Sequence, residues 1–457
     1  MANGARFEQA VGELSKDFSG RLLRPDEVGY DEARKVHNGL IDRRPALIAR
    51  CQGAADVANA VKLGREAGLE IAVRGGGHNV GGRATVDGGL MIDLAPMKGI
   101  HVDAKARRVR AQGGVTWGEF NRETQLHGLA TTGGAVSTTG IAGLTLGGGL
   151  GWLMPKYGMA LDNLVSAEVV TAEGKVLNAS ESDNADLFWA IRGGGGNFGV
   201  VTSFDYRLHS VGPVIYGGLV AHPFAKAREV LAFVRDFTAG IADEVMVFAG
   251  LLFAPDGSGN KIVAIVAAHC GDLAAGEKAL APLKSFGPPV MDALGPIPYV
   301  AINSMLDAGF PKGALNYWKS SFLDTLSNDA IAAIVDTYAR CQAPMSKILL
   351  EHFHGAVTRV PVDATAFAQR SPSVNLAILG QWPDPAQTDA TIAWTRETFE
   401  SLKSFQAPRR YLNYLGDDEA EGSVAAAYGP NFARLRAIKA KYDPGNLFHL
   451  NQNILPG

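Results

Sequence analysis

The glycine-rich segment 74–79, with the sequence RGGGHN, constrains this chain more than any other stretch. An apolar run at 71–73 precedes it and is typical of a short buried strand. Three consecutive glycines let the backbone approach a ligand closely and turn its N–H groups toward phosphate oxygens. A histidine directly after such a loop indicates a cofactor that is both wrapped and bonded. The alternative is a glycine-rich turn with an exposed histidine.

Two further glycine-rich segments follow, at 133–151 and 192–201. The first holds more glycines than one turn requires, as expected for extended backbone lying against a long flat ligand. Three such loops indicate a large cofactor such as a dinucleotide. A Rossmann fold is the rival, but no loop reads G-x-G-x-x-G between a strand and a helix with an acid about 20 residues further on.

The composition is that of an ordinary globular protein of two or three domains. The chain has 457 residues, of which 47% are hydrophobic and 19% charged, so a large core is expected and disorder is not. The net charge is 43 − 46 = −3 with no basic block, which argues against nucleic acid as a partner. No apolar run reaches 18 residues, so no membrane span is expected.

The N-terminus and the cysteines predict a cytoplasmic location. The first ten residues lack the basic and apolar regions of a secretion signal. The three cysteines, Cys51, Cys270 and Cys341, are far apart and odd in number. They fit a reducing compartment and form neither a metal-binding nor a CxxC pattern.

The first half of the chain reads as alternating strands and helices. A strand at 45–50, a helix at 54–69 and the strand at 71–73 form a unit consistent with βαβ. Short strands are expected at 90–93, 100–103 and 107–112. Thr116 and Glu119 then match a capping box that opens a helix running to about His127, which we interpret as structural.

The pattern changes at about residue 211. Helices at 225–238, 274–285 and 387–404 alternate with expected strands, which lie at 245–253, 261–268, 346–358 and 374–381. This mixture predicts an α+β lobe with an antiparallel sheet. We therefore expect a cofactor domain over 1–210, a substrate domain over 211–405 and a C-terminal segment, 406–457, that returns to the first domain.

Four motifs in order resemble a known family. They are RGGGHN at 74–79, GxxGxxLGGGxG at 140–151, KYGMALDN at 156–163 and WAIRGGGGNFGVVTSF at 189–204. The set is similar to the flavin-linked oxidases of the berberine bridge enzyme type, in the vanillyl-alcohol oxidase superfamily, to which the bacterial 6-hydroxynicotine oxidases belong. The resemblance implies a two-lobed α+β fold that binds FAD without a Rossmann unit.

The resemblance also implies how the flavin is held. The family bonds its flavin 8α-methyl group to the histidine of the first motif, here His78. Many relatives add a cysteine link at the position of Val136, so a single covalent bond is expected here. Such a bond holds the cofactor and raises its potential. Thr139 occupies the position that gates oxygen in relatives, and its small size favours an oxidase over a dehydrogenase.

Further residues follow from the same resemblance. The expected cofactor-binding residues besides His78 and Thr139 are Arg74, Gly75, Gly76, Gly77, Asn79, Gly140, Gly143, Gly147, Gly148, Gly149, Gly199, Val201, Asn413, Asn451 and Asn453.

The stretch 411–414 resembles the family's tyrosine–asparagine strand beside the flavin. There a tyrosine often acts as the base that takes the substrate's proton, or assists it. We expect Tyr414 in this role before Tyr411. A free tyrosine has a pKa of about 10 and needs activation to work near neutrality. The alternative is that the two tyrosines only pack on a strand.

Two pairs in the middle of the chain are candidates for substrate contacts. Tyr317 and Lys319 are two residues apart and share a face if the chain is extended, as do His352 and His354. A structural role is the alternative for both pairs. No third ligand is spaced to complete a metal site with the histidines, so no metal is predicted.

These observations predict an FAD-dependent oxidase. It removes hydride from a C–H bond next to a hydroxyl or amine of a small organic substrate, and O2 reoxidises the flavin to give H2O2. The alternatives are a flavin dehydrogenase with another electron acceptor, an NAD(P)H-dependent reductase, and a flavin carrier without turnover. A monomer and a homo-oligomer are both consistent with the sequence.

Overall fold

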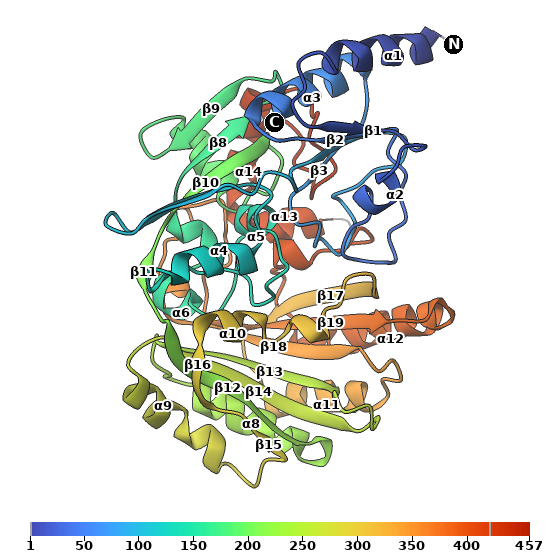
Figure 1. Ribbon diagram of the computed structural model, residues 1–457. Coiled ribbons are helices and arrows are strands. Elements are labelled where there is room, and N and C mark those ends of the chain that lie inside the picture. The colour runs from blue at the N-terminus through green and yellow to red at the C-terminus, as the bar shows by residue number, and fades with distance from the viewer. Residues whose placement is uncertain (1, 420–421) are drawn as a thin grey trace.

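The computed structural model describes residues 2–419 and 422–457. Figure 1 shows two halves, one built on two smaller sheets at the top and one on a large sheet below. Among the described residues no helix has the length and apolar character needed to cross a membrane.

A four-stranded sheet carries the first glycine loop at the end of a strand. Its order is β1 (Arg21–Leu23), β2 (Leu47–Arg50), β4 (Leu90–Asp93) and β3 (Ile71–Arg74). β2 and β3 both run parallel to β4, and helix α3 (Ala54–Ala67) connects them. α3 ends at Gly68, whose φ of 65° suits a left-handed cap. The loop 75–79 therefore begins where β3 ends.

A five-stranded antiparallel sheet forms the other part of this half. Its order is β5 (Ile100–Asp103), β6 (Arg108–Gln112), β10 (Val200–Arg207), β8 (Leu164–Val170) and β9 (Val176–Ser180). Helices α4 (Trp117–Gln125) and α7 (Ala185–Ile191) contribute to its core. The capping box of Thr116 and Glu119 is present, and His127 is exposed after the helix.

An eight-stranded antiparallel sheet forms the lower half. It comprises β12 (Val214–Pro223), β13 (Val245–Phe253), β14 (Lys261–His269), β15 (Met291–Asp292), β16 (Gly295–Pro298), β17 (Leu315–Leu323), β18 (Lys347–Phe353) and β19 (Ser373–Trp382). The central order is β14-β13-β18-β19-β17. Helices cover the lower face in Figure 1, namely α8 (Ala227–Thr238), α9 (Leu273–Ser285), α11 (Asn328–Ala339) and α12 (Thr388–Ser401). The α+β character expected for this region is confirmed.

Shorter elements complete the chain. They are α1 (Ala2–Leu14), α2 (Tyr30–Ala33), β7 (Leu129–Ala130), α5 (Ile141–Leu146), α6 (Met154–Tyr157), β11 (His209–Ser210), α10 (Tyr299–Ser304), α13 (Ser423–Tyr428) and α14 (Phe432–Tyr442). The last two helices belong to the upper half, where Tyr428 donates its hydroxyl to the backbone O of Gly194 (3.3 Å).

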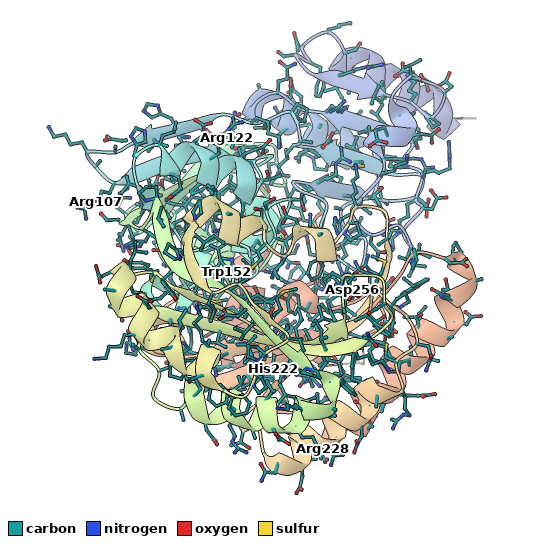
Figure 2. All side chains as sticks on the ribbon, turned by 60° about the horizontal axis from the view of Figure 1, so that its bottom comes forward. Arg107, Arg122, Trp152, His222, Arg228 and Asp256 are labelled. Atoms are coloured by element: carbon teal, nitrogen blue, oxygen red, sulfur yellow. The ribbon has the colours of Figure 1, made fainter. Side chains whose placement is uncertain are left out.

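A buried apolar cluster joins the two halves. Trp152 is 1% exposed and lies in the middle of the molecule (Figure 2), with its ring 4.7 Å from that of Phe248 on β13. Met154 and Met159 of the upper half and Phe353 of β18 belong to the same cluster. The upper half therefore packs directly on the upper face of the eight-stranded sheet.

Two predicted strands differ from the structure. The strand expected at 346–358 ends at Phe353, because Gly355 has a φ of 70° and starts a 3₁₀ turn. The strand expected at 411–414 is instead a 3₁₀ turn, Leu412–Tyr414. Since residues three apart share a side of such a turn, Tyr411 and Tyr414 lie together, with ring centroids 5.0 Å apart.

Candidate active site

A cavity of about 740 Å³ lies between the glycine loops and the eight-stranded sheet, and we call it the central cavity. Its volume falls within the range of about 300–1,000 Å³ typical of ligand and cofactor sites. All three glycine-rich segments contribute to its wall, and so do β13, β18, β19 and the C-terminal segment. It thus brings together residues from nearly the whole length of the chain.

The first two glycine loops pack against each other at the cavity wall. A Cβ on Gly76 would lie 2.3 Å from the backbone N of Gly140, so neither loop accepts a side chain there. A Cβ on Gly143, by contrast, would meet no atom within 4 Å, although Gly143 lines the cavity. The glycines therefore serve two purposes: close backbone packing and open space for a ligand.

Arg74 holds the first loop from behind. Its guanidinium donates to both carboxylate oxygens of Asp93 (2.9 and 2.7 Å), and its Nη1 donates to the backbone O of Lys35 (2.9 Å). Arg74 is 8% exposed and does not line the cavity. The expected cofactor contact of Arg74 is corrected to a structural one, because β3 pairs with β4 and places Arg74 directly beside Asp93.

His78 lines the central cavity between two threonines and a second histidine. Its Nε2 lies 3.0 Å from the hydroxyl of Thr138 and its Nδ1 lies 3.4 Å from that of Thr139. The ring of His37 stacks on it, with centroids 4.0 Å apart. Burial, together with His37, lowers the pKa of His78 to about 3. The imidazole is therefore neutral, with a lone pair on one of its two ring nitrogens.

Most of the expected cofactor residues line the cavity. Besides His78 and Thr139 these are Gly75, Gly76, Gly77, Asn79, Gly140, Gly143, Gly147, Gly199, Val201, Asn413 and Asn451. Gly148, Gly149 and Asn453 are not part of the lining. Gly148 and Gly149 form a turn with φ values of 142° and 95°, in which the N–H of Gly149 donates to Tyr411.

Tyr414 is partly buried and pairs with a buried carboxylate that the sequence did not single out. Its hydroxyl donates to Oε1 of Glu351 on β18 (2.8 Å), and Asn375 on β19 donates to Oε2 (2.6 Å). Burial raises the pKa of Glu351 to about 7, while burial and the nearby carboxylate raise the pKa of Tyr414 well above 10. Of the two groups, Glu351 is thus the one whose pKa lies near neutrality.

Tyr411 lines the cavity, and its hydroxyl oxygen is an acceptor of three hydrogen bonds from the chain. It accepts hydrogen bonds from the backbone N–H groups of Gly149 (3.1 Å) and Leu150 (3.3 Å) and from the amide of Asn413 (3.1 Å). Burial raises its pKa to about 12. These contacts give Tyr411 the task of fixing the second glycine loop.

Tyr317 and Lys319 lie outside the cavity lining. Tyr317 donates its hydroxyl to Asp418 (2.5 Å), and Lys319 donates to Asp418 (2.9 Å) and Glu419 (3.1 Å). Their neighbour Trp318 lines the cavity instead. Successive residues of a strand alternate between faces, so Trp318, and neither of the two residues expected to contact the substrate, is on the cavity side of β17.

The same correction applies to His352 and His354. His352 lines a separate pocket of about 350 Å³, together with residues of α8 and Leu350. The Nε2 of His354 lies 3.0 Å from the backbone O of Val245. On β18 the cavity residues are Lys347, Leu349 and Glu351. Among the described residues no group of three metal-ligating side chains is present.

Among the cavity residues that the sequence interpretation missed are Lys347, Glu351, Gln381 and Trp318. The segment 347–351 reads KILLE, an apolar run closed by a cation and an acid four residues apart. Residues four apart on a strand lie on the same face, so a charged residue at each end of this apolar run indicates a polar site on that face. The sequence could have been interpreted in this way. Nothing in the sequence indicated that Tyr414 would meet Glu351.

Comparison with known proteins decides the family. Residues 45–180 match the family described as "FAD binding domain", and residues 410–455 match "Berberine and berberine like". The (R)-6-hydroxynicotine oxidase of Paenarthrobacter nicotinovorans is 33% identical over 456 residues, covering 96% of this chain and 97% of that protein. The chain belongs to the berberine bridge enzyme-like FAD-linked oxidoreductases.

Further relatives agree with this assignment. An FAD-linked oxidoreductase of Dictyostelium discoideum is 31% identical to this berberine bridge enzyme-like protein over 452 residues, covering 98% of the chain and 97% of the relative. The structure of 6-hydroxy-D-nicotine oxidase from Arthrobacter nicotinovorans superimposes with a TM-score of 0.88 at 31% identity, covering 96% and 99%. The fold predicted from the four motifs is confirmed.

The central cavity of this oxidoreductase fits FAD. The opposed loops at Gly76 and Gly140 offer bare backbone, and Gly143 leaves space that a side chain would fill. Arg83 and Asn451 line the same wall, and Nε of Arg83 is buried without a hydrogen-bond partner among the described residues. A guanidinium with a buried N–H that has no partner among the described residues suits the phosphates of a dinucleotide.

Proposed function

We propose that this protein is an oxidase that removes hydride from a C–H bond next to a hydroxyl or amine of a small organic substrate. The observation that carries the proposal is the hydrogen bond between Tyr414 and the buried Glu351 in the wall of the FAD cavity. When bound, FAD accepts the hydride and passes the electrons to O2, giving H2O2. The protein's own residues supply the base.

The proton leaves the substrate through this pair. The Tyr414 hydroxyl donates to the Glu351 carboxylate at 2.8 Å, so it can take a proton from the substrate heteroatom as it gives its own to Glu351. Asn375 holds the second oxygen of Glu351 at 2.6 Å and fixes the carboxylate. A carboxyl with a pKa of about 7 accepts this proton and releases it again near neutral pH.

Covalent attachment of FAD to His78 is part of the proposal. The ring is neutral and held by Thr138, Thr139 and His37 at the cavity wall. A related structure, the glucooligosaccharide oxidase of Acremonium strictum, carries 6-S-cysteinyl and 8α-N1-histidyl FAD. It superimposes on this chain with a TM-score of 0.87 at 25% identity, and the match covers 98% of this chain and 99% of that one. Here Val136 lines the cavity and offers no thiol. One bond, through His78, is therefore expected.

Oxygen is the proposed electron acceptor. Thr139 lines the cavity beside His78 and presents a small side chain there. The relatives from P. nicotinovorans and A. strictum are both named oxidases. A dehydrogenase with another acceptor is the alternative.

The test is a substrate screen with two readouts. The holoenzyme is mixed with candidate alcohols and amines, first without oxygen to record bleaching of the flavin, then in air to record peroxide. An oxidase gives bleaching and stoichiometric peroxide. Bleaching with no peroxide in air would establish the dehydrogenase, and rapid bleaching by NADPH alone would point to a reductase.

A further inference from the structure

Lys347 is a buried lysine of the central cavity, and no carboxylate of the described residues pairs with it. It is 7% exposed, and its Nζ donates to the backbone O of Gly309 (2.6 Å) and to Oε1 of Gln381 (3.0 Å). The ring of Phe310 lies 4.1 Å from the ammonium. An ammonium group has three donors, and only two of them have acceptors among the described residues.

Two other buried lysines show what a satisfied ammonium looks like in this chain. Lys439 is fully buried and donates to Asp443 (2.6 Å) and to the backbone O atoms of Asn197 (2.7 Å) and Phe448 (3.0 Å). Lys319 meets both Asp418 and Glu419. Each has at least one carboxylate within 3.1 Å, whereas Lys347 forms no ion pair among the described residues.

Gln381 supplies a second free donor at the same place. Because an ammonium only donates, the amide of Gln381 turns its oxygen to Lys347, which leaves Nε2 for another partner. That nitrogen is buried without a hydrogen-bond partner among the described residues, and Gln381 is 1% exposed. Gln381 and Lys347 both line the cavity. Leaving a buried donor unpaired costs about 1–3 kcal/mol, so a ligand acceptor here is favoured.

We infer that Lys347 and Gln381 form a subsite for an anionic oxygen group of the substrate, a carboxylate in the first place. A carboxylate has two oxygens that accept several hydrogen bonds, and its charge favours the ammonium form of Lys347, whose pKa burial lowers to about 7. The inference rests on the proposed function, because it concerns the substrate of the same cavity. It assigns the enzyme to organic acids rather than to neutral sugars or alcohols.

The position of the subsite defines the rest of the substrate. Lys347 and Glu351 are four residues apart on one face of β18, so their Cα atoms are about 13 Å apart at ~3.3 Å per residue. Between and beside them the cavity is lined by Leu349, Leu379 and Trp318. The substrate class is therefore an acid with an apolar or aromatic body, oxidised at the end far from its carboxylate.

The test is a binding measurement that needs no turnover. Holoenzyme is titrated by calorimetry with 4-phenylbutanoate and with its neutral amide, 4-phenylbutanamide. We expect the acid to bind at least about tenfold more tightly, the gain typical of a charged hydrogen bond in a buried site. Equal affinities, or preference for the amide, would overturn the inference while leaving the oxidase proposal to its own peroxide test.

Variants locate the effect. Lys347→Met keeps the length of the side chain and removes its charge, so this variant should lose the preference for the acid over the amide. Gln381→Leu should reduce that preference about threefold or more. Lys278→Met, on the exposed surface of α9, is the matched control and should leave the preference intact. Flavin that stays bound to each purified variant shows that the variant is folded. If Lys347→Met does not fold, Gln381→Leu decides, and an undiminished preference in either folded variant would contradict the subsite.

Discussion

Glu351 is the residue on which the proposed chemistry depends. The residue is 4% exposed, and among the described residues its carboxylate has only Tyr414 and Asn375 as hydrogen-bond partners. The base form must be present when the substrate gives up its proton. Because burial raises the pKa of Glu351 to about 7, the rate of anaerobic flavin reduction should rise with pH and level off above about pH 7.

Substitutions test this role. Glu351→Gln keeps the shape and removes the base, so flavin reduction should slow by about 10²–10⁴-fold and lose its pH dependence near 7. Tyr414→Phe removes the hydroxyl that links substrate and carboxylate and should slow the same step at least about a hundredfold. Stopped-flow reduction at several pH values gives both results. Wild-type rates in Tyr414→Phe would remove the tyrosine from the mechanism.

Glu351 also destabilises the fold. Its pKa is higher in the folded than in the unfolded chain, so the folded state holds the proton longer and the free energy of unfolding falls as pH rises from about 4.5 to about 7. The shift corresponds to about 3 kcal/mol above pH 7. Glu351→Gln lacks this loss and should be more stable than wild type at pH 8 but not at pH 4.5. Urea unfolding at pH 4.5 and pH 8 measures this difference in stability. Glu397→Gln, at an exposed position, is the control.

We expect His37 to position His78 for the proposed flavin link. Its backbone N donates to the O of Gly77 (2.9 Å), directly before His78, and its ring stacks on that of His78 at 4.0 Å. His37→Ala removes the stacking and should lower the fraction of flavin that stays with acid-precipitated protein. His37→Phe restores an aromatic ring and should restore most of that fraction. Equal fractions in all three proteins would show that stacking does not matter.

At the scale of elements, strand β18 divides two environments. Leu349 lines the central cavity, whereas Leu350 is 5% exposed and belongs to the core beneath the sheet. Leu350→Ala should lower the free energy of unfolding by about 2–5 kcal/mol with little change in KM. Leu349→Ala should change KM for the substrate at a smaller cost in stability. Thermal unfolding and steady-state kinetics of the pair distinguish the two faces.

The strands also show where sequence interpretation succeeds and where it stops. Existence and type of β13, β14 and α8 follow from local periodicity, and the glycine loops follow from composition. Periodicity gives the two faces of a strand but not which face meets the cofactor. The choice of Tyr317 and Lys319 over Trp318, and of His352 over Glu351, failed for this reason.

At the scale of the whole molecule, the cavity depends on contacts between distant parts of the chain. Glu351 meets Tyr414, and Lys347 meets Gln381. Arg83 donates to the backbone O atoms of Gly416 (3.0 Å) and Asn451 (2.9 Å), which ties the C-terminal segment to the first glycine loop. No local pattern encodes such pairs. The family motifs predicted the cofactor. Glu351 was identified as a site residue only from its contact with Tyr414 in the folded chain.

Attachment of the flavin to His78 tests the account most directly. Purified protein is precipitated with acid, the pellet is washed, and the flavin-bearing peptide is identified by mass spectrometry after digestion. For the wild-type protein we expect a yellow pellet with one flavin on the peptide that contains His78. For His78→Ala we expect a colourless pellet. A colourless wild-type pellet with a yellow supernatant, or flavin on another peptide, would contradict it.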